Sequence, residues 1–145
     1  MKKILTTVAV LVTVVLLACC GGGLGAPAKS ETQKAAEKAV QCLKDKDYKG
    51  YVDMLYANER ELASPDKLAQ EREQYAELLK GKAEESAKKK GVEDLVVDYS
   101  FVSEEVDSLS AVVRMAITDG ANNVDTTDVK LRKDVNGDWK IVMGK

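Results

Sequence analysis

Carboxylates close to tyrosines are the residues of this chain whose types and spacing could do acid–base chemistry. The chain has 145 residues and no histidine, which excludes His-based triads and imidazole acid–base catalysis. Asp53 and Tyr56 are three residues apart, a spacing that makes two side chains neighbours on a helix. Asp98 and Tyr99 are adjacent on a predicted strand, so they point to opposite faces and cannot cooperate. A carboxylate beside a tyrosine is common on any helix, so we assign no catalytic residue and expect a protein that is not an enzyme.

Two acidic segments contain side-chain oxygen atoms that could in principle bind a metal ion. The motif Asp134-x-Asn136-x-Asp138 matches the start of a calcium-binding loop, in which alternating side chains converge on one ion. The match then ends, because position six is Trp139 instead of glycine and position twelve is Lys145 instead of glutamate. The second segment, Asp119–Asp128, has no recognised ligand spacing. We interpret both segments as solvated turns and predict no metal site and no cofactor.

The first eighteen residues differ in composition from the rest of the chain. Lys2 and Lys3 precede the uncharged run Ile4–Ala18, which is shorter than the roughly twenty residues that span a bilayer as a helix. A short basic region, an apolar core and a small residue are the layout of a secretory signal peptide. We therefore predict that residues 1–18 are a signal peptide, with an uncleaved membrane anchor or an ordinary secretory signal as the alternative.

The segment Leu16-Leu17-Ala18-Cys19 resembles a bacterial lipobox. In lipoprotein precursors of that kind the cysteine sulfur receives a diacylglycerol, and cleavage leaves the lipidated cysteine as the first residue. The resemblance implies that Cys19 carries fatty-acyl chains such as palmitate and anchors the protein to the membrane. Cys20 is the alternative acceptor, although Cys19 before it matches the motif less well than Ala18. Cys20 also stands where an aspartate commonly signals inner-membrane retention, which favours the outer membrane.

Residues 19–29 are rich in glycine and predict a flexible tether, which leaves residues 30–145 as a single domain. The 22 basic and 24 acidic residues give a net charge of −2, which argues against nucleic acid as a partner. The third cysteine, Cys42, is predicted to be a half-buried small apolar residue in the first helix. A disulfide between Cys20 and Cys42 remains open as an alternative.

Three helices are predicted in the first half of the domain. Ser30 and Gln33 predict a capping box at the start of the first helix, which ends near residues 44–47. A second, short helix presents apolar and aromatic residues on one face, namely Tyr48, Tyr51, Val52, Leu55 and Tyr56. The third is the longest, with Ser64 and Pro65 at its start and Gly91 as its C-terminal cap. Its predicted apolar stripe is Leu68, Tyr75, Leu79 and Ala83.

After Gly91 the apolar period changes from 3.6 to 2, which predicts four antiparallel strands. Their predicted spans are 95–101, 109–117, 124–133 and 139–143, with a turn near 104–108. The third span is the most polar and suits an edge strand. Asn136-Gly137 predicts a two-residue type I′ hairpin, because both residues tolerate positive φ. The predicted fold class is α+β, with N-terminal helices packed on a curved four-stranded antiparallel sheet.

Two segments carry a resemblance to a known fold family. They are Lys46-Asp47-Tyr48-Lys49-Gly50-Tyr51 and the ending Gly137-Asp138-Trp139-Lys140-Ile141-Val142-Met143. With helices first and a meander last, residues 30–145 resemble the nuclear transport factor 2-like, or cystatin-like, cone of small bacterial lipoproteins of unassigned function. The resemblance implies a sheet folded around the long helix, with a pocket at its open end for an apolar ligand.

Four aromatic residues are candidates to line that pocket, and core packing is the simpler interpretation of each. They are Tyr51, Tyr56, Tyr99 and Trp139. We expect a non-enzymatic lipoprotein that binds a small apolar ligand or another envelope protein. Because the same fold carries isomerases and hydrolases, an enzyme using Asp53 and Tyr56 is one alternative. A structural component of an envelope assembly is the other.

Overall fold

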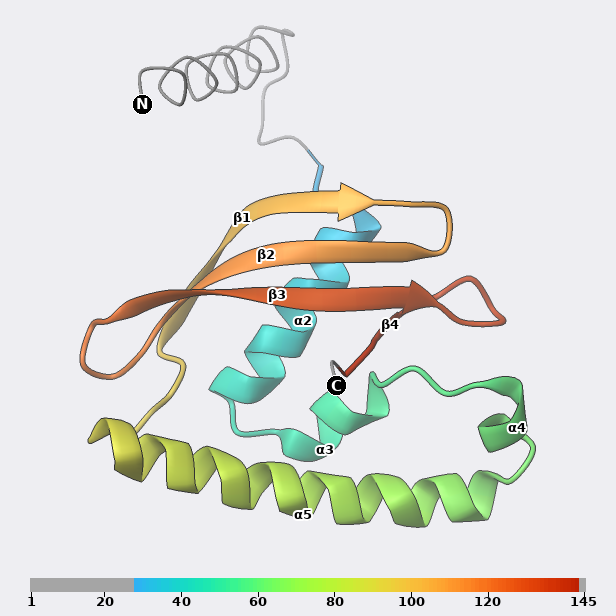
Figure 1. Cartoon of the computed structure of the whole chain (residues 1–145), viewed down its shortest axis with the longest axis horizontal. Helices are drawn as coiled ribbons and strands as arrows, with labels where there is room; N and C mark the ends of the chain where they lie inside the picture. Colours follow the sequence, from blue (N-terminus) through green and yellow to red (C-terminus); the bar gives the residue numbers. More distant parts are fainter. Residues whose placement is uncertain (1–27, 144–145) are drawn as a thin grey trace, which may run out of the picture.

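Four helices precede a four-stranded antiparallel sheet in the computed structural model, which describes residues 28–143 (Figure 1). The helices are α2 (Glu31–Lys44), α3 (Tyr48–Asp53), α4 (Glu59–Leu62) and α5 (Pro65–Lys90). The strands are β1 (Asp98–Val106), β2 (Ser110–Thr118), β3 (Val124–Lys133) and β4 (Trp139–Ile141), in the spatial order β1-β2-β3-β4. The predicted α+β class is therefore confirmed.

Several predictions concern the N-terminal segment. The predicted signal peptide, Cys19, Cys20 and most of the predicted tether lie outside the described residues. From residue 28 to residue 143, no helix has both the length and the apolar character that crossing a bilayer requires.

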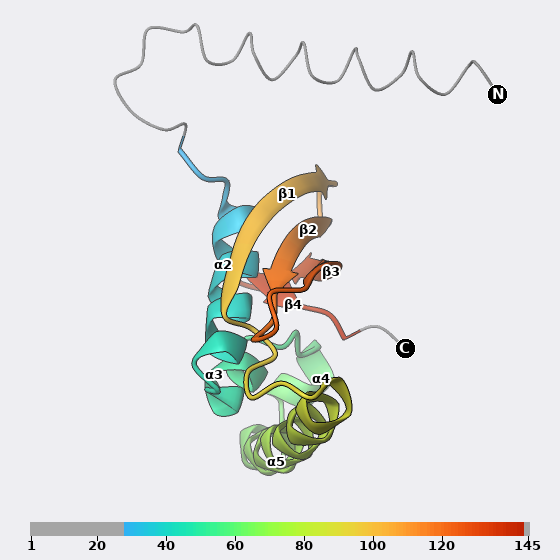
Figure 2. The ribbon, with the colours of Figure 1, turned by 90° about the vertical axis from the view of Figure 1, so that its left-hand side faces the viewer.

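The core lies between α2 and the inner face of the sheet, as Figure 2 shows from the side. The small residues Ala36 and Ala39, together with Val40, let α2 approach all four strands closely. Across the sheet, alternate residues of β2 point inward, and Val113 and Met115 are fully buried. Burying one such side chain contributes about 1.5–3 kcal/mol. Because this buried cluster runs from Ala36 to Ile141, we expect residues 28–145 to fold as a domain.

The long helix α5 lies outside this core, so the expectation that the sheet folds around it is wrong. It packs on α3 and α4 (Figures 1 and 2), and none of its 26 residues is fully buried. Its apolar stripe is too narrow for a core position. Leu68, Leu79 and Ala83 are only half-buried, and Tyr75 is 41% exposed.

The helices begin close to the predicted residues, but not every predicted capping hydrogen bond is formed. Ser30 caps α2 by accepting a hydrogen bond from the Gln33 amide (3.0 Å). The Gln33 side chain donates to Glu37 instead of the cap (2.9 Å), so the predicted capping box is incomplete. Ser64 makes no side-chain capping hydrogen bond. A complete capping box occurs in α4, a helix that the sequence patterns did not predict.

The first strand starts and ends later than predicted, and it contains a bulge. The pairing of β1 with β2 shifts between Phe101 and Ser103, and a bulge resets which residues face inward. Beyond it, Glu104 pairs with the buried Val113 and so points toward α2. There its carboxylate accepts a hydrogen bond from the Ser30 hydroxyl (2.8 Å). The predicted turn at 104–108 is therefore partly strand.

The last hairpin lies at the predicted place but has a different turn. Gly137 has a positive φ of 80°, whereas Asn136 does not, so the predicted type I′ turn is wrong. The Asp134 amide instead donates to the Asp138 carbonyl (2.9 Å), and the Asp134 carboxylate accepts from the Asn136 and Asp138 amides (2.9 Å each). The calcium-like motif thus forms a hairpin connection. Between residues 28 and 143, no group of three or more Cys, Asp or Glu side chains is arranged to hold a metal ion.

Candidate ligand-binding groove

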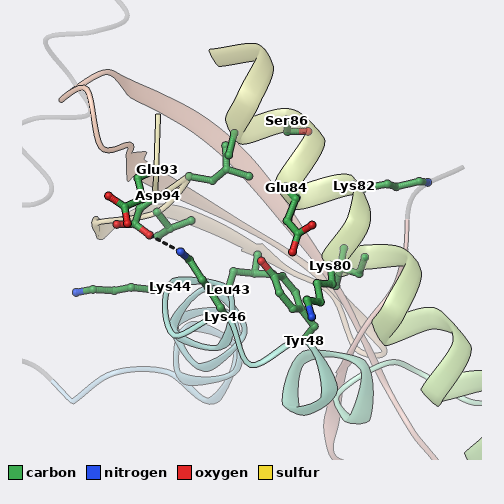
Figure 3. Close-up of a pocket in the computed structure, with 15 residues that line it drawn as sticks. Leu43, Lys44, Lys46, Tyr48, Lys80, Lys82, Glu84, Ser86, Glu93 and Asp94 are labelled. Carbon is green, nitrogen blue, oxygen red and sulfur yellow. Dashed lines mark ion pairs between the residues drawn. The ribbon is translucent and has the colours of Figure 1, made fainter. Parts of the chain in front are cut away.

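A groove of about 500 Å³ separates the C-terminal half of α5 from the rest of the domain (Figure 3). Its other walls are the connection between α2 and α3 and the segment 93–96 before β1. The volume lies within the range typical of small-molecule sites. Apolar side chains make its floor, namely Leu43, Tyr48, Leu79, Ala83, Ala87, Leu95 and Val96.

On the α5 side, the floor of the groove is made by residues at helical spacing. Leu79, Ala83 and Ala87 are four residues apart and share one face of the helix. They are half-buried, and two of the three are alanines. Small side chains at the centre of this face leave the space that larger residues would fill.

The opposite wall depends on a tight connection between α2 and α3. Lys46 has φ of 57°, a left-handed conformation that is rare for a residue with a side chain. The Asp47 amide donates to the Cys42 carbonyl across this turn (2.8 Å). The turn places Leu43 and Tyr48 on the groove, with Lys46 reaching Asp94 in an ion pair of 2.8 Å. This hydrogen-bonded pair raises the pKa of Lys46.

Charged groups of both signs surround the apolar floor. Lys80 and Glu84 project from α5 into the groove and toward Tyr48 (Figure 3). Neither forms an ion pair with another residue in the described part of the chain. Lys44 and Lys82 also border the groove but point away from it (Figure 3). Glu93 also lines the groove without an ion pair in the described part of the chain, and it lies beside Asp94 on the wall opposite α5 (Figure 3). On the α5 wall, Lys80 and Glu84 present one unpaired cation and one unpaired anion above the apolar floor.

A second pocket of about 320 Å³ continues the groove along α5. It shares Ser86, Leu95 and Val96 with the first. From there it reaches Ile117 and Thr127 on the sheet. The two pockets therefore adjoin each other at these shared residues.

The four aromatic candidates lie elsewhere, and none of them lines the groove. Tyr51 packs against the core, and burial raises the pKa of its hydroxyl. The Tyr99 hydroxyl donates to Gln41 Oε1 on α2 (2.8 Å), and burial and then the nearby Glu37 raise its pKa. The other two lie under cations, with Arg132 5.0 Å from the Tyr56 ring and Lys133 5.1 Å from the Trp139 ring.

The residues considered for catalysis are not brought together. Asp53 is exposed and Tyr56 half-buried, and no hydrogen bond in the described part of the chain joins their side chains. Cys42 is half-buried as predicted and makes no disulfide within residues 28–143. Burial and then the nearby Asp47 raise the pKa of its thiol.

Sequence reasoning missed the groove because its walls come from three separate segments. The sequence predicts Tyr48 on one face of a short helix, and Leu79 and Ala83 on the apolar stripe of the long helix. The one available signal was the weakness of that stripe, since a helix with too few large apolar residues leaves a face incompletely packed.

Comparison with known proteins gives one informative likeness. No protein-family model and no curated protein sequence matches the chain. Among solved structures, a Campylobacter jejuni protein described as a "Putative NTF2-like transpeptidase" has a similar fold, with a TM-score of 0.57. The two chains are 19% identical, and the match covers 79% of this chain and 100% of the other. At that identity the likeness shows the fold alone. The predicted fold is therefore confirmed: the described residues have a nuclear transport factor 2-like fold.

Proposed function

We propose that this protein is a lipid-anchored, non-enzymatic component of the bacterial envelope that binds a small apolar ligand. The groove between α5 and the rest of the domain carries the proposal, because apolar side chains form its floor and its volume of about 500 Å³ suits a small molecule. The segment Leu16–Cys19 supports the anchoring. Because buried side chains pack the space between α2 and the sheet, the proposal places the ligand in the groove instead of the interior.

An apolar fluorescent probe tests the proposed site. The domain of residues 28–145, titrated with N-phenyl-1-naphthylamine, is expected to raise the probe's fluorescence to saturation. Ala83→Trp fills the groove and should abolish that signal. Ala69→Trp is the matched control, because Ala69 is exposed on the same helix and does not line the groove. Absence of saturable binding, or equal binding by the Ala83→Trp variant, would contradict the proposal.

A second candidate function, peptidyl transfer, is favoured only by the description of the Campylobacter jejuni protein. Transfer through a covalent intermediate needs a nucleophile activated by a base. Ser86 borders the groove but has no hydrogen-bonded base in the described part of the chain. Cys42 has a raised pKa, which opposes thiolate formation. Added mass on either residue after incubation with an activated peptide ester would support transfer and contradict the proposal of a binding protein.

Another envelope protein remains the alternative occupant of the same groove. A protein partner would be recovered covalently attached to the full chain after crosslinking in intact cells. If the Ala83→Trp variant lost that partner while the wild-type domain failed to bind the apolar probe, the partner would replace the small molecule as the proposed ligand.

A further inference from the structure

We infer that the groove recognises a single-chain zwitterionic amphiphile, whose anionic group lies at Lys80 and whose cationic group lies at Glu84. The inference rests on the proposed function, because it names the ligand class of the same groove. Its three supports are the elongated apolar floor, the pair of opposite charges above that floor and the lack of internal partners for those charges.

The floor suits one hydrocarbon chain. Leu79, Ala83 and Ala87 span two turns of α5, a length of about 12 Å at 1.5 Å per residue. Leu95 and Val96 line both this pocket and the adjoining one, in which Ile117 is the further apolar residue and the other lining residues are polar or charged. A narrow, extended apolar surface fits an alkyl chain better than a compact ring system.

The charges above the floor select the polar end of the ligand. Lys80 and Glu84 both point into the groove (Figure 3), and neither has an ion-pair partner between residues 28 and 143. They are four residues apart with lysine first, the less favourable order for a pair within a helix. Each is thus available to a ligand group of opposite charge.

A ligand of one charge sign does not match this arrangement. An anionic headgroup would be attracted by Lys80 but repelled by Glu84. A cationic headgroup would be attracted by Glu84 but repelled by Lys80. On the opposite wall, Lys46 and Asp94 neutralise each other through an ion pair of 2.8 Å, and Glu93 lies beside Asp94 (Figure 3). A phosphate and an ammonium group in one headgroup satisfy both unpaired side chains. The Tyr48 hydroxyl, which has no hydrogen bond in the described part of the chain, offers a further donor beside them.

Four amphiphiles with the same twelve-carbon chain test the inference. The domain of residues 28–145 is titrated calorimetrically, below micellar concentrations, with dodecylphosphocholine, dodecyl phosphate, dodecyltrimethylammonium and dodecyl maltoside. Dodecylphosphocholine is expected to bind most tightly, by about two- to fivefold for each partly exposed charge contact. Lys80→Ala should remove its advantage over dodecyltrimethylammonium, and Glu84→Gln should remove its advantage over dodecyl phosphate.

Matched controls separate these contacts from general charge effects. Lys88→Ala and Glu77→Gln change exposed charges on the same helix, and neither residue lines the groove or the adjoining pocket. Both variants should keep the wild-type order of affinities. All five proteins should unfold at similar temperatures, because the substituted side chains are exposed.

The outcomes distinguish this inference from the proposed function. Equal affinity for all four amphiphiles would contradict the preference for a zwitterionic headgroup but would still support an apolar binding site. A preference for dodecyl phosphate that Glu84→Gln does not change would also overturn it. Tighter binding of the zwitterionic peptide tri-leucine than of dodecylphosphocholine would replace the lipid with a peptide. If none of these compounds and no apolar probe binds, the proposed function itself fails.

Discussion

Asp119 shows how one carboxylate shapes a connection that the sequence marks only as polar. It follows β2 and is 4% exposed. Its Oδ1 accepts hydrogen bonds from the backbone amides of Asn123 (3.0 Å) and Ala121 (2.9 Å). Those bonds close the turn in which Asn122 takes a positive φ of 63°. Asp119 therefore organises the β2–β3 connection through its own carboxylate, as an Asx-type turn does.

The stability of the domain should depend on the ionisation of Asp119. The hydrogen bond from the Asn123 amide, followed by those from the Asn123 side chain and the Ala121 amide, lowers its pKa against the opposing effect of burial. The folded protein thus binds fewer protons here than the unfolded chain. The stabilisation is complete above the unfolded value of about 4 and is lost as pH falls through the lower folded pKa.

Replacing Asp119 by Asn should lower the unfolding midpoint at pH 7 and flatten its decrease between about pH 5 and pH 2. Thermal unfolding followed by circular dichroism at each pH measures both effects. Asp98→Asn is a suitable control, because Asp98 is exposed at the start of β1. The assignment would be wrong if the Asp119→Asn variant kept the full wild-type dependence on pH.

At the scale of the element, the two glycines of α5 differ in role. Gly81 lies inside the helix, where alanine would also fit, whereas Gly91 ends the helix in a conformation that favours glycine. Gly81 lies within the helix, and a Cβ built there meets no atom within 4 Å. Gly91 has φ of 67° and caps the helix, donating its amide to the Lys88 carbonyl (3.2 Å). That conformation places the Cβ of other residues close to the following carbonyl.

Alanine at these two positions should have opposite effects on stability. Gly81→Ala should raise the free energy of unfolding by about 0.5–1 kcal/mol, because alanine loses less backbone entropy in a helix. Gly91→Ala should lower it by about 1–2 kcal/mol through the left-handed conformation. Urea denaturation of the residue 28–145 domain gives both values. Two changes of the same sign would mean that α5 does not end as described.

For the molecule as a whole, the lipid anchor proposed from the sequence would place the domain at a membrane surface. The described chain begins at residue 28, nine residues after Cys19. Ser30, the N-cap of α2, donates its hydroxyl to Glu104 on the edge strand β1 (2.8 Å). The tether would therefore enter the domain beside β1, on the opposite side of the sheet from α5 in Figure 1. That arrangement would leave the groove accessible while the chain is anchored.

Replacing Cys19 by Ala in the full chain should prevent acylation and leave an uncleaved precursor. Cells grown with an alkyne-labelled palmitate, followed by mass spectrometry of the purified chain, measure both results. Cys20→Ala serves as the control and should be acylated like the wild type. Acylation of the Cys19→Ala chain would identify Cys20 as the acceptor, and unlabelled wild-type protein would remove the lipid anchor from the proposal.

Local signals in the sequence predicted the order of the elements and several of their ends. Pro65 and Gly91 bound the long helix because each acts within its own turn of backbone. The alternation through Val113 and Met115 identified the buried face of β2, since successive strand residues face opposite sides. Such effects depend on residues close together in the chain, so they can be read without the tertiary structure.

Only the tertiary structure decided which helices and strands pack against one another. The sequence marks α2 and α5 alike as amphipathic helices, but packing against a curved sheet favours the small Ala36 and Ala39 of α2 over the longer, more polar α5. The bulge in β1 turned Glu104 toward Ser30, a contact across 74 residues. The groove likewise joins Leu43, Leu79 and Leu95 from three segments. Side-chain packing between distant segments determines such contacts, whereas local propensity determined the helices and strands that make them.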